Sequence, residues 1–399
     1  MKTPKKQRNS QGRSAVFSAR FLQAPLRKGA RGIDRALFLY ILLLIIFGSV
    51  MVFSASTAYA SIRFSNPYYF IQRQILWVLV GLAAMLLCAS LPIDLYARIA
   101  KPLFISTLIL LALVPFLGAE AGGAKRWIAI GGFTFQPSEL AKTALVLFLA
   151  LYFSRHTGEI KNTANGKRSF LYGILYPLLF ILSLCALVAL EKHLSCMIIL
   201  GAIGVFMMFL AGSNVKTLAL MGGGAITAVG IFALSVEYTK RRITIWLNPE
   251  LYPQDGGWQT LQGLLAIGSG GFFGLGLGNS RLKYLYVSEP QNDFIFTIAC
   301  EELGFIGALS ILLLFALFVK RGVRLALRQG SLFSSLVALG ITVKVAIQVI
   351  LNIAVITNTI PNTGISLPFF SYGGSSLLML FAEMGILLSI SKKSELTYR

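Results

Sequence analysis

The residues in this sequence that could do chemistry are charged side chains placed inside or beside long apolar stretches. Asp293 directly precedes one such stretch, and Glu139 and Lys142 lie three residues apart within another. Charges in a lipid-like environment are costly and by default mark functional sites. A carboxylate at such a position could accept a proton from a hydroxyl group, and nearby cations could hold a phosphate.

A second group of polar side chains lies shortly before Glu139. Lys125, Arg126, Trp127 and Gln136 form a cationic cluster that we expect to face outward. Lysine and arginine can bind a diphosphate, and the bound anion compensates their charge where the dielectric constant is low. These positions alone indicate an enzyme or transporter acting on a lipid phosphate.

A third group follows one face of a later apolar stretch. Lys344, Gln348 and Asn352 recur at i+4 spacing, so they share a helix face, and Glu383 lies in the last apolar stretch. Such a stripe faces a cavity or another helix rather than lipid. Hydrogen bonding between helices explains it at least as well as contact with a ligand does.

Several of these residues, and His193, also have a purely structural interpretation. Spacing alone favours Asp293 as an ordinary helix start, because a short acceptor side chain satisfies free N–H groups there. Glu139 and Lys142 are as compatible with a buried structural pair as with a binding site. His193, at the outer end of a helix, fits a structural role better than metal binding.

The composition shows which elements must position these residues. Hydrophobic residues make up 56% of the 399 residues and charged residues 13%, against about 45–50% and about 25% in an ordinary globular protein. A soluble fold could not bury so much apolar surface, so the chain is an all-α polytopic membrane protein. Four cysteines, Cys88, Cys185, Cys196 and Cys300, all lie in apolar stretches. Neither disulfides nor a zinc site is therefore expected.

Hydrophobic runs of about 17–25 residues predict ten transmembrane helices. We expect them at 36–55, 75–91, 102–118, 138–153, 171–190, 194–211, 216–235, 293–319, 332–356 and 374–390. With both termini in the cytoplasm, the inner segments hold more than twice as many Lys and Arg as the outer ones. Membrane anchoring therefore explains the net charge of +21, and nucleic-acid binding is not expected.

This pattern divides the chain into five parts. Residues 1–35 are a basic disordered cytoplasmic tail, 36–235 hold helices one to seven, 236–292 form a large extracellular loop, 293–390 hold helices eight to ten, and 391–399 are a cytoplasmic tail.

Two outer segments have unusual sequences. In the large loop, small residues recur every four positions at Gly270, Gly274 and Gly278, which favours close helix packing. The last outer loop, 360–376, is apolar but rich in Gly and Pro. It could dip into the membrane if it lines a cavity in the protein.

Four segments resemble the SEDS family, the bacterial FtsW/RodA group. They are GAKRWI at 123–128 with QPSELAK at 136–142, GSGGFFGLGLGNS at 268–280, YLYVSEPQNDFIFTIACEELG at 284–304, and PNTGISLPFFSYGGSS at 361–376. The resemblance covers residues 36–390, and its third and fourth segments are nearer the FtsW branch than RodA.

The resemblance implies a peptidoglycan glycosyltransferase in the bacterial plasma membrane. Such an enzyme polymerises lipid II into β-1,4 glycan strands at the division septum and releases undecaprenyl diphosphate. Asp293 would be the general base for the acceptor hydroxyl. The expected substrate-binding residues are Lys125, Arg126, Gln136, Glu139, Lys142, Lys344 and Ser371.

The resemblance also implies a class B penicillin-binding transpeptidase and other divisome proteins as partners. No cofactor is demanded, although a divalent cation, Mg²⁺ or Mn²⁺, could sit at the diphosphate. The chain departs from the family at Glu191, Lys192 and His193, where many relatives have Glu-Pro-Asp. A lipid II flippase and a non-catalytic scaffold that recruits the transpeptidase are the alternative functions.

Overall fold

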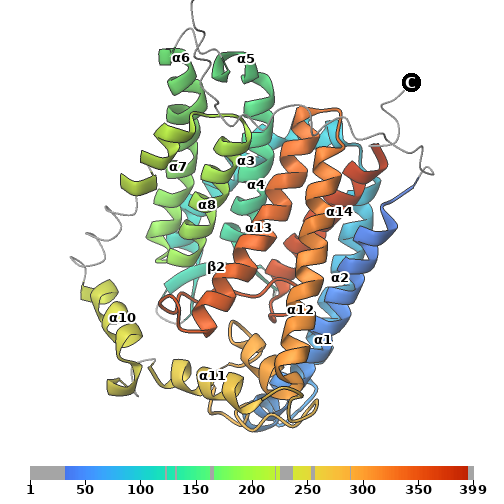
Figure 1. Cartoon of the computed structure of the whole chain (residues 1–399), viewed down its shortest axis with the longest axis vertical. Coiled ribbons are helices and arrows are strands. Elements are labelled where there is room, and N and C mark those ends of the chain that lie inside the picture. Colours follow the sequence, from blue (N-terminus) through green and yellow to red (C-terminus); the bar gives the residue numbers. More distant parts are fainter. Residues whose placement is uncertain are drawn as a thin grey trace, which may run out of the picture.

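The computed structural model describes residues 32–121, 124–130, 133–161, 166–220, 222–224, 237–252, 257–287 and 289–393. In these ranges the chain forms a bundle of long apolar helices (Figure 1). Eight helical segments of the described chain are long and apolar enough to cross a membrane. They are α1 (Arg35–Phe64), α2 (Tyr69–Ser90), α3 (Ile93–Leu117), α4 (Pro137–Arg155), the continuous α6 (Gly166–Phe170), η2 (Leu171–Leu175) and α7 (Tyr176–Leu190), α12 (Ile295–Leu327), α13 (Leu332–Ile356) and α14 (Gly374–Lys393).

These helices confirm the all-α membrane fold that the composition predicts. A shorter apolar helix, α8 (Leu194–Leu210), matches the sixth expected span. Most of the seventh span, 216–235, lies outside the described residues, as do residues 1–31 and 394–399 of the two tails. The total of ten helices therefore stays a prediction.

The spans differ in how deeply they are buried within the protein. In the most apolar window of α4 and of α14, 72% of the residues are buried, whereas the corresponding share in α2 is 22%. The central helices thus face other helices, while α2 has one face exposed to the surroundings. Central position explains how α4 and α14 can carry the charged residues Glu139, Lys142 and Glu383.

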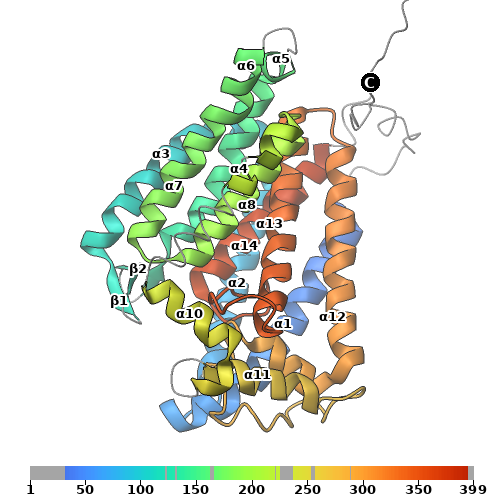
Figure 2. The same cartoon turned by 60° about the vertical axis from the view of Figure 1, so that its left-hand side comes forward.

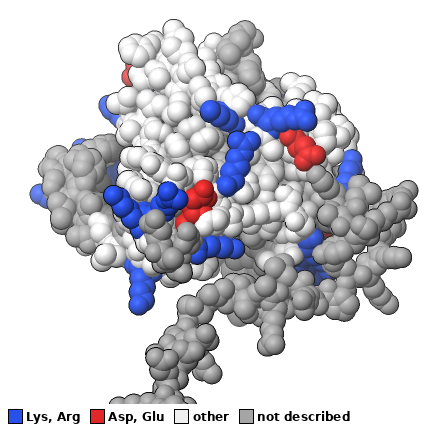
Figure 3. Space-filling view, turned by 90° about the horizontal axis from the view of Figure 1, so that it is seen from above, with Lys and Arg blue, Asp and Glu red and all other residues white. Residues whose placement is uncertain are grey.

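One end of the bundle is basic. Figure 3 shows the end that is uppermost in Figure 1, where Lys and Arg predominate over Asp and Glu. Asp34 caps α1 here by accepting a hydrogen bond from the Leu37 backbone N–H at 3.0 Å. Its carboxylate also pairs with Arg321 of α12 at 2.8 Å. This is the end that the positive-inside rule assigns to the cytoplasm.

The opposite end, called here the site end, carries the strands and the helical segments of the predicted extracellular loop (Figures 1 and 2). Between α3 and α4 the chain forms a three-stranded antiparallel sheet of β1 (Ala119–Ala121), β2 (Ala124–Ile130) and β3 (Phe133–Phe135). No element was predicted between the expected spans 102–118 and 138–153, so this sheet was missed. Glycine pairs between short runs of alternating polar and apolar residues are typical of β-hairpins and were the available signal.

The predicted extracellular loop 236–292 is also partly helical. It contains α10 (Glu237–Leu247), the 3₁₀ turn η3 (Pro249–Leu251) and α11 (Gly257–Ser269). In both views α11 lies across the site end rather than along the bundle (Figures 1 and 2).

A glycine breaks α12 near its beginning. Gly304 has a φ of +68°, and a Cβ atom there would come within 2.3 Å of the Gly274 nitrogen. The backbone N–H groups of Leu275 and Gly276 donate to the carbonyls of Glu301 and Glu302, both at 3.0 Å. The close approach expected of the glycine series is therefore confirmed. The prediction that these glycines pack one helix against another is wrong, because Gly274 and Gly278 have positive φ and lie outside any helix.

Buried side chains reinforce this junction. Glu302 accepts hydrogen bonds from Ser54 of α1 at 2.5 Å and from the Lys283 amine at 3.1 Å. Glu301 accepts one from the Ser280 hydroxyl at 2.5 Å. The turns 270–287 are thus fixed to the first nine residues of α12.

Residues 357–373, here called the re-entrant loop, connect α13 to α14 and run into the bundle. Phe369 and Phe370 are buried, and the Phe369 carbonyl lies so close to Gly48, in the middle of α1, that a Cβ atom would be 2.1 Å from it. The Phe370 ring lies 5.8 Å from that of Phe315 in α12. The expectation that this loop dips inward and is covered by protein is confirmed.

Candidate active site

Asp293 lies at the site end, two residues before α12 begins. Its main chain is fixed by Asn352 of α13, whose amide donates to the carbonyls of Asp293 at 2.8 Å and of Ile365 at 2.7 Å. Its carboxylate faces the re-entrant loop, because a Cβ atom on Gly364 would lie 3.5 Å from Oδ2. Gly364, with a φ of +69°, permits this approach.

The helix-start interpretation of Asp293 is wrong. The N-cap of α12 is Phe294, and no side chain caps the helix. Asn292 instead donates to Glu289 at 2.7 Å. Burial raises the pKa of Asp293 to about 6, and the nearby charge of Glu289 adds to the increase. The carboxylate is therefore a stronger base than an exposed aspartate.

A buried polar chain crosses the bundle beside the re-entrant loop. Lys142 and Glu139 pair at 2.7 Å, as the i+3 spacing allowed. Lys344 pairs with Glu383 at 2.6 Å, and the Thr143 hydroxyl donates to the same carboxylate at 2.5 Å. Both lysines are thus neutralised by protein carboxylates.

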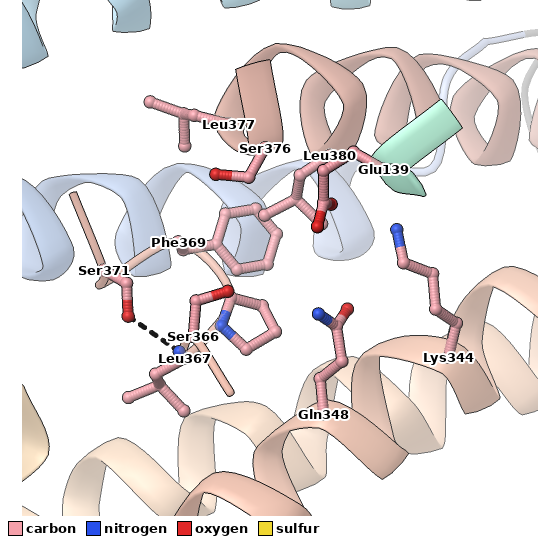
Figure 4. Close-up of a pocket in the computed structure, with 11 residues that line it drawn as sticks. Glu139, Lys344, Gln348, Ser366, Leu367, Phe369, Ser371, Ser376, Leu377 and Leu380 are labelled. Carbon is pink, nitrogen blue, oxygen red and sulfur yellow. Dashed lines mark hydrogen bonds between the residues drawn. The ribbon is translucent and has the colours of Figure 1, made fainter. Parts of the chain in front are cut away.

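Glu139, Lys344 and Gln348 point into one small cavity, which the re-entrant loop closes (Figure 4). The cavity measures about 20 Å³, close to the space that one water molecule needs. Ser371 also lines it, and its hydroxyl accepts from the Leu367 backbone N–H at 2.7 Å. In this conformation these residues order the loop and leave no room for a sugar.

The cations of β2 lie on another flank of the site end. Arg126 donates to the backbone carbonyls of Glu191 at 3.2 Å and Lys192 at 2.7 Å. Lys125 is exposed, and its amine lies 3.4 Å from the Pro115 carbonyl. Arg126 therefore fixes the turn between α7 and α8, and Lys125 stays accessible from the site end.

The turn that departs from the family pattern has an unusual electrostatic environment. Glu191 is 1% exposed, and burial raises its pKa to about 8. Burial, together with the charge of Arg126, lowers the pKa of His193 to about 4. His193 contacts Gln136 at 3.4 Å and Ser138 at 3.2 Å through Nδ1. A neutral His193 thus positions the beginning of α4.

The re-entrant loop connects these groups. Its Thr363 carbonyl accepts from the Ser195 hydroxyl at the start of α8. Its Asn362 carbonyl accepts from Arg242 at 3.1 Å and its Asn358 carbonyl from Trp246 at 2.8 Å, both on α10. The loop therefore lies between Asp293, the buried pairs, the α7–α8 turn and α10.

The structure brings together some of the expected site residues and separates others. Glu139, Lys344 and Ser371 share one cavity, with Lys142 bonded to Glu139. Arg126 and Gln136 meet at the α7–α8 turn, whereas Lys125 lies at the edge. The sequence did not predict the contacts of Arg242 and Trp246 with the re-entrant loop. The basic run 240–242 was the signal that could have indicated a role for this segment.

Comparisons with known proteins agree with this architecture. The family model FTSW_RODA_SPOVE, described as cell cycle protein, matches residues 34–396. Stage V sporulation protein E of Bacillus subtilis (strain 168) is 39% identical over 365 residues, covering 90% of this chain and 97% of that protein. A probable peptidoglycan glycosyltransferase FtsW of Geobacter sp. (strain M18) is 37% identical over 365 residues, covering 91% and 97%.

Two solved structures have the same fold. One, described as showing structural coordination of polymerization and crosslinking by a peptidoglycan synthase complex, matches with a TM-score of 0.76 and 28% identity, over 91% of this chain and 98% of that chain. The rod shape determining protein RodA of Thermus thermophilus matches with a TM-score of 0.66 and 28% identity, over 92% and 98%. The chain therefore belongs to the FtsW/RodA/SpoVE family of cell cycle proteins.

Proposed function

We propose that this protein is a peptidoglycan glycosyltransferase that polymerises lipid II, with Asp293 as general base. The observation that carries the proposal is the position of Asp293, whose carboxylate faces the re-entrant loop at the site end and has a pKa raised to about 6. A base with a pKa just below the working pH is mostly ionised yet still accepts a proton well. The names of the relatives support the same reaction.

In this reaction the 4-hydroxyl oxygen of the acceptor GlcNAc attacks C1 of the donor MurNAc. The C1–O bond to the phosphate breaks, and undecaprenyl diphosphate leaves with the bonding electrons. Asp293 takes the hydroxyl proton, and attack from the opposite face converts the α-linked donor into a β-1,4 linkage. Asn352 holds the Asp293 backbone in place during this step.

We assign the leaving diphosphate to the cations of the site end. Lys125 is exposed there, and Arg126 lies beside the α7–α8 turn. We assign Gln136, Glu139, Lys142, Lys344 and Ser371 to substrate contact after the re-entrant loop has moved, because in the present conformation they bond to one another or to the loop.

A divalent cation, Mg²⁺ or Mn²⁺, could assist at the diphosphate. Among the described residues, no three His, Cys, Asp or Glu side chains lie together as a metal site. Mg²⁺ commonly takes only one or two protein carboxylates and fills its coordination with phosphate oxygens and water. A cation held in this way would arrive with the substrate and neutralise charge on the leaving group.

We further propose that the protein works beside a class B penicillin-binding transpeptidase and other divisome proteins at the division septum, with the site end outside the plasma membrane. Support comes from the solved complex, whose description joins polymerization with crosslinking. The basic end, with Arg321 and its neighbours, would then face the cytoplasm.

Substitution Asp293→Asn tests the reaction. We expect glycan polymerisation from purified lipid II to fall by about 10²–10⁴-fold, because the amide cannot accept the proton. Glu289→Gln is the matched control, since it changes an exposed carboxylate four residues away; it should keep most of the activity. The amount and length of the glycan products on gels report the activity of both variants, with the partner transpeptidase present.

The same variants separate the alternatives. Full polymerisation by Asp293→Asn would overturn the catalytic assignment. Transfer of labelled lipid II across proteoliposomes without polymerisation would indicate a flippase. A wild-type protein that does neither, yet binds the transpeptidase, would indicate a scaffold.

A further inference from the structure

Hydrogen-bonding capacity that the protein leaves unused is concentrated around the re-entrant loop. Six of the described residues bury side-chain oxygen or nitrogen atoms that have no hydrogen-bond partner: Gln74, Glu191, Gln291, Asn352, Thr363 and Ser375. Native proteins pair nearly all buried polar groups, so each exception needs an explanation. Asn352 and Gln291 bond to or lie beside Asp293 and the re-entrant loop, where unused polar atoms suit a polar ligand.

Three of these residues form a neutral group on the α2 side of Asp293. The Gln291 carbonyl accepts from the Tyr372 N–H at 2.8 Å. The Tyr372 ring lies 5.0 Å from Phe70 of α2, and a Cβ atom on Gly374 would lie 2.5 Å from the Trp77 ring.

These contacts place the remaining two residues of the group. Gln74 lies four residues after Phe70 and three before Trp77, on the same face of α2. It therefore faces the segment that ends at Ser375. In Gln74 both the amide nitrogen and the amide oxygen lack partners.

The chemistry of this group selects its ligand. Two carboxamides and a hydroxyl offer both donors and acceptors but carry no charge of their own. The neighbouring guanidinium of Arg73 is hydrogen-bonded to Tyr372 and lies over the Tyr69 ring. Such a set suits the hydroxyl and acetamide groups of a sugar and would bind a diphosphate poorly. The cations Lys125 and Arg126 lie instead with β2 and the α7–α8 turn.

We infer that Gln74, Gln291 and Ser375 form the subsite for the acceptor N-acetylhexosamine, whose 4-hydroxyl then reaches Asp293. This inference rests on the proposed function and adds to it the location of the acceptor. Gln291 is two residues from Asp293, so a sugar bound here presents a hydroxyl to the carboxylate. The Tyr372 ring packs edge-on against Phe70 beside this group.

Substitution Gln74→Leu tests the subsite, because leucine has a similar size and no polar atoms. An unpaired buried amide costs stability, so its replacement by an apolar group should keep or raise the melting temperature. The matched control is Gln72→Leu, which changes an exposed glutamine on the same helix. Ser375→Ala is a second, smaller change that removes a single hydroxyl.

Two probes distinguish the proposed sugar subsite from the diphosphate site by binding alone, without catalysis. The soluble disaccharide-pentapeptide carries the sugars but no diphosphate, and undecaprenyl diphosphate carries no sugar. For Gln74→Leu we expect disaccharide affinity to fall by about tenfold and undecaprenyl diphosphate affinity to stay within about twofold, with Gln72→Leu unchanged for both.

Other results would overturn the inference. These are an unchanged disaccharide affinity, an equal loss for both probes, or a lower melting temperature of both Gln74→Leu and Ser375→Ala. Because binding is measured directly, the result does not depend on catalysis. If the wild type does not polymerise lipid II, the proposed function is refuted. If the wild type polymerises normally but Gln74→Leu binds the sugar unchanged, only the subsite is refuted.

Discussion

Two opposing influences act on the carboxylate of Asp293. A hydrogen bond from its own backbone N–H favours the ionised form. Burial against the re-entrant loop disfavours the ionised form, and the charge of Glu289 acts in the same direction. Burial prevails, since the pKa is raised to about 6 from the ordinary value of 3.8.

This pKa predicts the pH dependence of the reaction. Polymerisation should increase as the pH rises through about 6 and level off above it, because only the ionised base accepts a proton. In Glu289→Gln the increase should shift to lower pH, since a negative charge that raises the pKa is removed. Initial rates across the range measure both profiles. A midpoint that is the same in both proteins would contradict the role of Glu289.

The sequence predicted contacts between residues only where they are near in the chain. The pair of Glu139 and Lys142 followed from i+3 spacing on one helix. The partner of Lys344 could not be predicted, because Glu383 lies on another helix and many arrangements of ten helices are possible. For the same reason the unpaired amide of Gln74 became visible only in the fold.

At the scale of helices, the lengths of apolar runs were sufficient for most boundaries. The expected span 332–356 matches α13 at both ends, and 374–390 lies within α14. The break in α12 was not predicted, because it depends on the approach of Gly274 to Gly304 from a distant turn. The sheet beside α4 was also missed, since two of its three strands, β1 and β3, are only three residues long.

The ion pair between α13 and α14 should stabilise the bundle only as a pair. In Lys344→Met the Glu383 charge stays buried without its partner, which we expect to cost about 3–5 kcal/mol. The double variant Lys344→Met/Glu383→Leu should recover most of this loss. Thermal unfolding in detergent compares the wild type, both single variants and the double variant. Additive losses in the double variant would show that the two residues do not interact.

For the whole molecule, the two ends differ in charge and in the elements they carry. This difference predicts on which side of the membrane each end lies. After replacement of the four native cysteines, Lys125→Cys should react with a membrane-impermeant maleimide in intact cells. Lys167→Cys, at an exposed position within α6 at the basic end, should react only after lysis. The reverse pattern would invert the topology and place Asp293 in the wrong compartment for extracellular polymerisation.

The junction at Gly304 has a mechanical consequence for the site. Asp293 is followed by a nine-residue helical piece that ends at the glycine, and the carbonyls of Glu301 and Glu302 in this piece are bonded to turns outside the bundle. A protein that displaced those turns would tilt the piece and thereby move the carboxylate relative to its sugar. The long membrane-spanning part of α12 would stay still, so control over the reaction could be exerted entirely from the surface.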